Sequence, residues 1–229
     1  MKVNLNLGDT QLIMAECQKQ SLSTAQTAYV LATAYHETAH KMKPVREMGG
    51  EKYLKSKKYY PFVGMGYVQL TWKDNYKKAG DKLGVDFVAD PKKLLLAEHA
   101  TPILVTGMRE GWFTGKKLSD YLNETKRDFV NARRIINGTD RAKDIAAIAE
   151  AYEQALLDAK TVAKPEPSVE IKVPVTVPDP AVVKEPVQTE VVVTTQPPPP
   201  KPESNRNKLL TGLAAVVAAM PLLAKCFGG

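Results

Sequence analysis

Apolar residues recur at helical spacing over most of the first 160 residues. The clearest stripe lies in residues 142–160 and comprises Ile145, Ile148, Ala149, Tyr152, Leu156 and Leu157. An Ala-rich run over residues 23–42 has the same periodicity, begins after Leu22 and should end before Pro44, because proline interrupts a helix. These patterns predict helices over both segments.

Capping and breaking residues predict the remaining elements. Asp9 or Thr10 should begin a helix that extends to residue 19, and Asp74 or Asn75 one that ends before Gly84. Further helices are expected from Asp90-Pro91 to residue 97, over 101–112, 119–122 and 126–136. Residues 66–72 alternate enough for a short strand or an extended turn. The sequence therefore predicts a mainly α domain with at most a small β element.

Composition divides the chain into three parts. Residues 1–160 contain both Trp, all Tyr and all His, whereas residues 164–202 contain no aromatic residue. We expect a folded domain over 1–160, a disordered Pro-rich linker over 161–205, and a hydrophobic C-terminal helix within 206–229. The apolar run 209–224 would be about 24 Å long as a helix, against about 30 Å for a bilayer core. It predicts a membrane-associating tail, with docking on a partner as the alternative.

Charge and cysteine content narrow the function classes. The net charge is +7, which suits a polyanionic partner such as nucleic acid, an anionic membrane or an acidic cell-wall polymer. The chain has no Cys/His cluster, Gly-rich phosphate loop or Arg-rich helix, so we expect no nucleic-acid partner. Cys17 and Cys226 do not form a disulfide framework, and the first residues lack the pattern of a cleavable secretory signal.

The segment Tyr35-His36-Glu37-Thr38-Ala39-His40 admits two kinds of chemistry. As an H-E-x-x-H string on a helix, it would place His36 and His40 on one face to bind zinc, with Glu37 as base. The remaining histidine, His99, would have to supply a third ligand. The sequence thus allows a zinc-dependent peptidase as one hypothesis.

The alternative is a glycosidase, which needs one protonated acid and one ionised carboxylate. Glu37 ends an apolar helix, where partial burial would raise its pKa and keep the proton on. Glu47 follows ten residues later, beyond Pro44, and Glu51 competes with it for the second role. Residues alone leave the choice between Glu47 and Glu51 open.

The segment Gly64-Met-Gly-Tyr-Val-Gln-Leu-Thr-Trp-Lys-Asp-Asn-Tyr76 adds a more specific signal. Together with the preceding His-Glu-Thr, a loop Glu and the later Ile135-Ile-Asn-Gly138, it resembles the family-19 chitinases and, more closely, the chitinase-like endolysins of bacteriophages. The resemblance covers residues 28–140. It departs from the family at Ala39-His40, where a Gly usually follows His-Glu-Thr, and it lacks the cysteines of the plant enzymes.

The resemblance implies a lysozyme-like, two-lobed helical fold and inverting hydrolysis of a β-1,4 bond without a cofactor. Glu37 would be the general acid, Glu47 the base that activates water, and Thr71 a hydroxyl that helps to hold that water. The implied substrate-binding residues are His36, Tyr67, Gln69, Asn75 and Asn137. Whether the bond is muramyl or glucosaminyl stays open.

The leading expectation is therefore an endolysin that cleaves peptidoglycan glycan strands for host lysis. It would be made in the bacterial cytoplasm and act at the cell wall, tethered to the inner membrane by residues 206–229. Lys52, Lys55, Lys57 and Lys58 would suit the carboxylates of peptidoglycan peptides better than neutral chitin, although a solvated loop has the same composition. Two alternatives to this expectation are the zinc-dependent peptidase and a non-catalytic, membrane-tethered wall-binding module.

Overall fold

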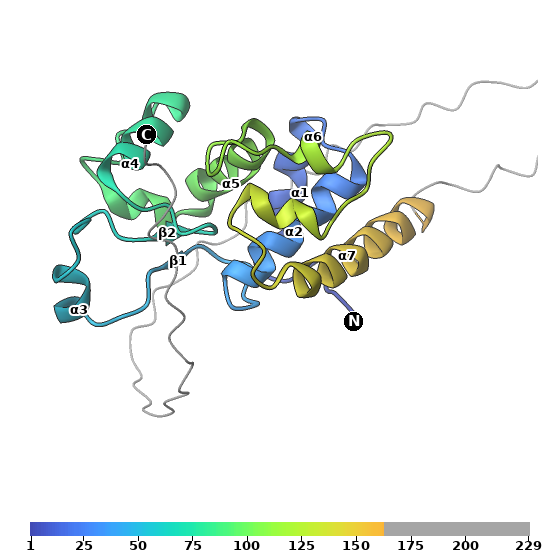
Figure 1. Ribbon diagram of the computed structural model, residues 1–229, viewed down its shortest axis with the longest axis horizontal. Coiled ribbons are helices and arrows are strands. Elements are labelled where there is room, and N and C mark those ends of the chain that lie inside the picture. The colour runs from blue at the N-terminus through green and yellow to red at the C-terminus, as the bar shows by residue number, and fades with distance from the viewer. Residues whose placement is uncertain (163–229) are drawn as a thin grey trace, which may run out of the picture. The chain divides into compact units, whose positions relative to one another are not determined.

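The computed structural model describes residues 1–162, and these form a mainly helical unit (Figure 1). The sheet is a single antiparallel pair, β1 (Val45–Arg46) and β2 (Met65–Gly66), with Val45 opposite Gly66. The prediction of at most a small β element is therefore confirmed within residues 1–162, although the strand expected over 66–72 is limited to Met65–Gly66 and its partner Val45–Arg46 was not predicted. Most of the predicted linker and all of the predicted tail lie outside the described residues. Within the described part, no helix is both long and apolar enough to cross a membrane.

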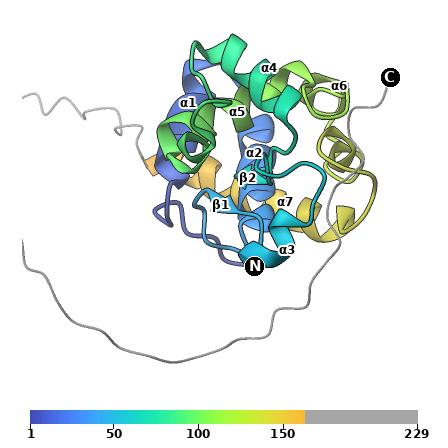
Figure 2. The ribbon, with the colours of Figure 1, turned by 90° about the vertical axis from the view of Figure 1, so that its left-hand side faces the viewer.

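Helix α2 (Thr24–Glu37) lies at the centre of the helices that pack around it (Figure 2). Ser23 and Gln26 form a capping box at its start, as each side chain accepts a hydrogen bond from the other's backbone N–H. Every residue from position 27 to 34 is buried. Three helices surround it: α1 (Thr10–Lys19), α5 (Ala97–Glu110) and α7 (Ala142–Val162). Burial on all sides explains why this segment is rich in small residues.

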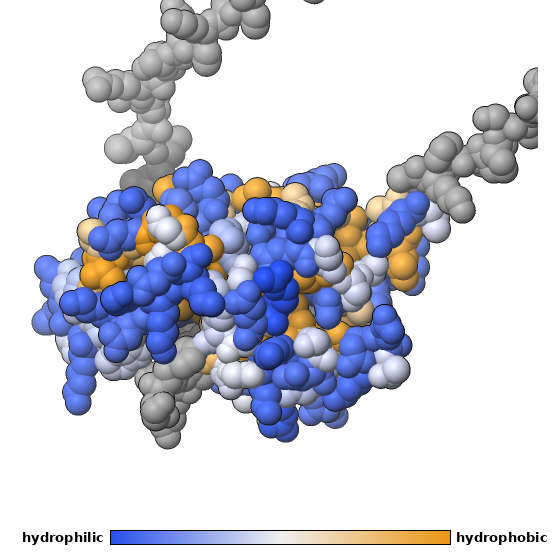
Figure 3. Space-filling view, turned by 90° about the horizontal axis from the view of Figure 1, so that it is seen from above, coloured by the Kyte–Doolittle hydropathy of each residue, from blue (hydrophilic) through white to orange (hydrophobic). Residues whose placement is uncertain are grey.

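Helix α7 packs along α2, as its predicted stripe requires. Ile145, Ile148, Ala149, Tyr152 and Leu156 are buried, but Leu157 is 44% exposed, so its inclusion in the stripe is wrong. The apolar stripes of these helices face inward. The face shown in Figure 3 is mainly hydrophilic, with apolar patches between the polar side chains.

The remaining elements are α-helices of 4 to 11 residues and two 3-10 turns. They are α3 (Glu51–Lys55), α4 (Lys73–Leu83), α6 (Leu118–Tyr121) and the 3-10 turns η1 (Pro91–Leu95) and η2 (Asn131–Ile135). Gly84 ends α4 in the left-handed conformation, as expected. The helices predicted over 90–97 and 126–136 are wrong in type, because each contains only a short 3-10 turn.

The start of α5 and the end of α2 both differ from the sequence prediction. Helix α5 begins at Ala97, so Pro102 lies inside it. A proline there has no N–H to donate to the carbonyl of Glu98, and Glu98 is an exposed residue. Helix α2 ends at Glu37, well before Pro44. Thr38 ends it by donating its hydroxyl to the carbonyl of Ala34 at 2.7 Å.

Candidate active site

Glu37 is the last residue of α2, and its carboxylate is buried in an ion pair with Arg133 of η2. Oε1 of Glu37 accepts a hydrogen bond from Nη1 of Arg133 at 2.6 Å, and each side chain is 4% exposed. Nε of Arg133 also donates to the carbonyl of Asp140 at 3.1 Å, which orients the guanidinium. Among the described residues, Oε2 of Glu37 has no hydrogen-bond partner. Arg133 thus holds one carboxyl oxygen, and no described residue holds the other.

Sequence reasoning missed Arg133, although a signal exists. Arg133 stands between the apolar residues Ala132 and Ile135 in a segment that the sequence marks as an ordinary amphipathic helix. Ala132 and Ile135 are buried, and so is Arg133. Arginine is almost never fully buried unless it is paired. An arginine within an apolar stripe therefore signals a buried acidic partner, but the sequence does not say which one.

His36 precedes Glu37 in α2, and Asn137 follows η2, which carries Arg133. His36 is half-buried, and this burial lowers its pKa, an effect that the neighbouring charge of Glu37 partly opposes. His36 is therefore neutral near pH 7. The backbone N–H of Asn137 donates to the carbonyl of Arg133 at 3.0 Å, and Oδ1 of Asn137 accepts from the N–H of Gly138 at 2.9 Å. We call Glu37, Arg133, His36 and Asn137 the helical half of the site.

Glu47 follows β1, and neutral donors hold its carboxylate. Oε1 accepts from the hydroxyl of Tyr59 at 2.7 Å, and Oε2 accepts from the backbone N–H of Gly64 at 2.9 Å. Its own backbone N–H donates to the carbonyl of Gly64 at 2.6 Å. Burial raises the pKa of the Tyr59 hydroxyl, and the hydrogen bond to Glu47 raises it further, so Tyr59 stays a donor. Glu47 is half-buried and fixed in orientation.

Glu51, the alternative to Glu47, has a different environment. Its side chain is exposed, and Oε1 pairs with Nη2 of Arg46 at 2.8 Å. An exposed ion pair of this kind is free to exchange with water. The geometry therefore favours Glu47 as the carboxylate that is held in place.

The Gly-x-Gly-x-x-Gln-Leu-Thr motif forms the turn next to Glu47. A Cβ at Gly64 would come within 2.8 Å of Oε1 of Gln69, so glycine makes room for that side chain. Nε2 of Gln69 donates to the carbonyls of Val45 at 2.9 Å and Gly66 at 3.3 Å. Gln69 thus connects the turn to β1. The sequence predicted only that Gln69 binds sugar, and did not predict this structural role.

Thr71 and Asn75 complete this region. The hydroxyl of Thr71 donates to the carbonyl of Gln69 at 2.8 Å, and Nδ2 of Asn75 donates to the carbonyl of Thr71 at 2.8 Å. Trp72 is 39% exposed and packs edge-on against Tyr59, with ring centroids 5.3 Å apart. We call Glu47, Tyr59, Gln69, Thr71 and Asn75 the loop half of the site.

Tyr67 does not belong to either half. Its side chain has no exposed surface, and its hydroxyl donates to Oδ2 of Asp9 at 2.8 Å. A ring with no accessible face has none to offer to a sugar. The expectation that Tyr67 contacts substrate is therefore wrong, because tertiary packing places this residue in the core.

The zinc hypothesis required His36 and His40 on one helix face, and this premise is also wrong. Helix α2 ends at Glu37, and His40 adopts a left-handed φ of 66° beyond it. The ring of His40 stacks on Tyr35, with centroids 4.4 Å apart. His99 instead packs edge-on against Phe87. Within residues 1–162, no group of three His, Cys, Asp or Glu side chains is placed to hold a metal ion.

A pocket of about 520 Å³ adjoins the loop half, because Asn75 belongs to both. It lies between α4 and the turn that follows α5, and it is lined by Leu70, Asn75, Lys78, Ala79, Asp81, Lys82, Gly111, Trp112 and Phe113. Neither Glu37 nor Glu47 lines it. Asn75 is the one predicted site residue in its wall.

Comparison with known proteins adds no relative to this picture. No protein-family model matches the chain, and no curated protein or solved structure matches it. The family resemblance therefore rests on the sequence motifs alone.

Proposed function

We propose that this protein hydrolyses β-1,4 glycosidic bonds of bacterial peptidoglycan by inverting acid–base catalysis. The observation that carries the proposal is the contrast between two held carboxylates, Glu37 and Glu47. Arg133 binds one oxygen of Glu37, whereas neutral donors bind Glu47. Inverting glycosidases need two such groups in different environments, one to donate a proton and one to accept a proton.

Glu37 would act as the general acid through Oε2. Its proton passes to the glycosidic oxygen while the bond from that oxygen to the anomeric carbon breaks. The carboxylate that remains is stabilised by Arg133, because a charge-assisted hydrogen bond favours the ionised form. The same ion pair favours the ionised form of Glu37 before the step as well as after it, so Glu37 must take up a proton at Oε2 from solvent before it can act as the acid.

Glu47 would act as the general base. It removes a proton from a water that attacks the anomeric carbon from the opposite face, which yields a product of inverted configuration. Tyr59 and Gly64 hold the carboxylate in orientation, and Thr71 supports the water through its hydroxyl oxygen. Solvent exchange then returns a proton to Glu37 and removes one from Glu47.

Two assays on the purified full-length chain test this proposal. The first measures release of reducing ends from peptidoglycan sacculi and identifies the new reducing-end sugar by mass spectrometry, which also assigns the bond as muramyl or glucosaminyl. The second compares the rate of reducing-end release between the wild type and Glu37→Gln. The glutamine keeps an oxygen for Arg133 but cannot donate a proton as an acid. We expect Glu37→Gln to reduce the rate by about a hundredfold or more. Absence of new reducing ends with the wild type, or full activity in the variant, would contradict the proposal.

In this proposal the biological role is lysis of a bacterial host from within. The protein would reach the wall from the cytoplasm, with residues 206–229 as a membrane tether. Both statements follow from the motif resemblance and the apolar run at 209–224. Fractionation of cells that express the full chain, compared with a chain ending at residue 205, tests the tether: the full chain should sediment with membranes and the shorter chain should not.

A further inference from the structure

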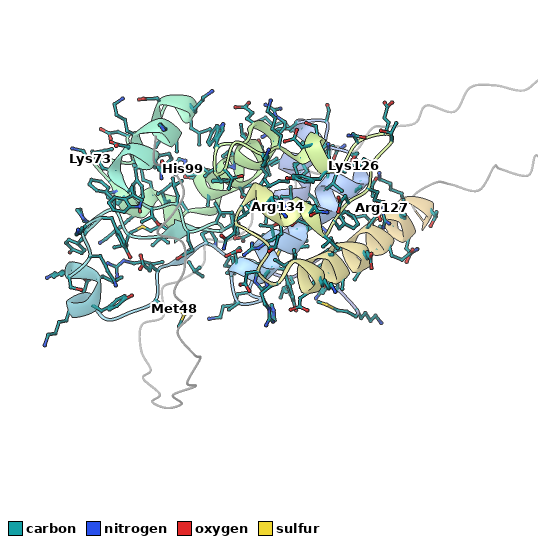
Figure 4. The ribbon with its side chains drawn as sticks, viewed as in Figure 1. Met48, Lys73, His99, Lys126, Arg127 and Arg134 are labelled. Atoms are coloured by element: carbon teal, nitrogen blue, oxygen red, sulfur yellow. The ribbon has the colours of Figure 1, made fainter. Side chains whose placement is uncertain are left out.

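The segment that follows Glu47 concentrates positive charge beside the loop half of the site. Residues 48–60, which we call the lysine loop, contain α3 and four lysines: Lys52, Lys55, Lys57 and Lys58. The one acidic residue of the lysine loop, Glu51, pairs with Arg46 outside it. Met48 begins the loop, is 74% exposed, and points away from the domain in Figure 4. The loop therefore presents net positive charge to solvent.

Lys57 lies over an aromatic ring within this loop. Its ammonium lies 3.8 Å from the centroid of the Tyr53 ring, within the range of a cation–π interaction. The ring of Tyr53 also lies close to Gly49, since a Cβ at Gly49 would come within 2.5 Å of Cδ1 of Tyr53. Gly49 also has a φ of +132°, which strongly favours glycine. Gly49, Tyr53 and Lys57 thus form a stack that limits the freedom of the ammonium before any ligand binds.

The stack is connected directly to the proposed base. Tyr59, two residues after Lys57, donates its hydroxyl to Glu47. The backbone N–H of Tyr60 donates to the carbonyl of Lys57 at 3.1 Å, so these residues share one tight turn. A substrate positioned at Glu47 therefore lies next to the turn that carries Lys57.

We propose that Lys57, assisted by Lys52, Lys55 and Lys58, binds the carboxylates of peptides attached to the glycan substrate. This inference rests on the proposed function and adds a specificity element to it. A neutral glycan offers no anion to the lysine loop, whereas a peptide-bearing glycan offers a carboxylate near the cleaved bond. A cation that is already held in place loses less side-chain entropy on binding than a free lysine does.

An anionic membrane is a second polyanion that lysines attract, but the loop fits it less well. Membrane-surface segments combine basic residues with a continuous apolar face. In the lysine loop, α3 spans only Glu51–Lys55 and exposes one aromatic ring, that of Tyr53, over which the Lys57 ammonium lies; the other exposed apolar side chains, Met48 and Tyr60, lie outside the helix. Leu54 is fully buried in the core. The lysine loop therefore lacks the long amphipathic helix of a membrane-surface segment, and the carboxylate-bearing glycan is the partner that we infer.

The test compares two substrates and three variants of the full-length chain. The substrates are peptidoglycan sacculi and the same glycan after an amidase has removed its peptides. We expect Lys57→Gln to lower kcat/KM about fivefold on sacculi, near the upper limit for a partly exposed ion pair, and to leave the stripped glycan unaffected. Lys57→Arg should retain activity on both substrates because it keeps the charge. Lys116→Gln, an exposed lysine between α5 and α6, is the matched control and should change neither.

Several outcomes would overturn the inference while leaving the proposed function intact. Equal loss on both substrates would place Lys57 against the sugar, and no loss on sacculi would remove it from recognition. Binding to anionic vesicles that depends on Lys57, with unchanged cleavage of sacculi, would assign the loop to membranes. Co-sedimentation of Glu37→Gln with sacculi, with and without Lys57→Gln, reports peptide binding independently of catalysis. A wild type that cleaves neither substrate but shows Lys57-dependent co-sedimentation would refute the proposed function alone.

Discussion

The two carboxylates of the candidate site are held in opposite ways. Glu37 is buried against a charged partner, Arg133, that comes from a segment almost a hundred residues later in the chain. Glu47 accepts hydrogen bonds from a phenol and a backbone amide, both within the next 17 residues. The helical half therefore depends on long-range packing, whereas the loop half is assembled locally. Damage to the first should affect folding and chemistry together, and damage to the second should affect chemistry more.

The largest expected effect distinguishes the two loop carboxylates. Glu47→Gln should lower the rate of peptidoglycan hydrolysis by about a hundred- to ten-thousandfold, the usual contribution of a general base. Glu51→Gln is the matched control, because it makes the same change at an exposed position in the same segment. Reducing-end release measures both. A large loss in Glu51→Gln with an active Glu47→Gln would reverse the assignment of the second carboxylate.

The next effect concerns the stability of the helical half. Arg133→Met leaves Glu37 as a buried carboxylate without its partner, and breaking a buried pair from one side costs about 3–5 kcal/mol. Urea unfolding of the purified domain measures this loss. The neighbouring Arg134→Met is the control, since Arg134 is exposed on η2 (Figure 4) and should cost less than about 0.5 kcal/mol. Comparable losses in the two variants would mean that the ion pair does not stabilise the fold.

A smaller effect is expected at Tyr59. Tyr59→Phe removes one hydrogen bond from Glu47 and keeps the ring against Trp72. We expect a loss of about 0.5–1.5 kcal/mol in unfolding free energy, together with a clear decrease in kcat. If kcat is unchanged, the orientation of Glu47 by Tyr59 plays no part in the reaction. Comparing the loss in unfolding free energy of Tyr59→Phe with that of Arg133→Met shows how differently the two halves are stabilised.

The smallest effect is the pH dependence contributed by His36. Burial lowers its pKa in the folded state below the value of about 6.5 for an exposed histidine. The unfolded chain therefore binds the proton more readily, so stability is present above about pH 6.5 and is lost as the pH falls towards the folded pKa. Urea unfolding at about pH 7.5 and about pH 5.5 should show a smaller decrease for His36→Gln than for the wild type. Identical decreases would mean that burial does not disfavour the charged imidazole.

The local part of the fold was predictable from the sequence. The starts of α2 and α7 follow from capping and periodicity, and Gly84 fixes the end of α4. Helix α1 begins at the predicted position, but Asp9 makes no capping hydrogen bond and accepts instead from the hydroxyl of Tyr67. Helix α2 ended earlier than predicted, because Thr38 satisfies the last turn with its own hydroxyl long before Pro44. The helix expected over 126–136 is only a 3-10 turn, in a segment whose Arg133 turns inward to Glu37. Helix propensity depends on neighbouring residues, so it cannot predict an ion pair with a residue that is distant in the chain.

The sequence by itself determined the helical character of the domain and the break in composition near residue 160, and it offered Glu37 with either Glu47 or Glu51 as candidate carboxylates. Each of these depends on residues that are close in the chain. Only the tertiary structure decided that Arg133 pairs with Glu37, that Tyr67 belongs to the core, and that His40 leaves the helix face. These outcomes depend on which surfaces are buried together, because burial determines whether a polar group must find a partner and whether an aromatic ring has a free face.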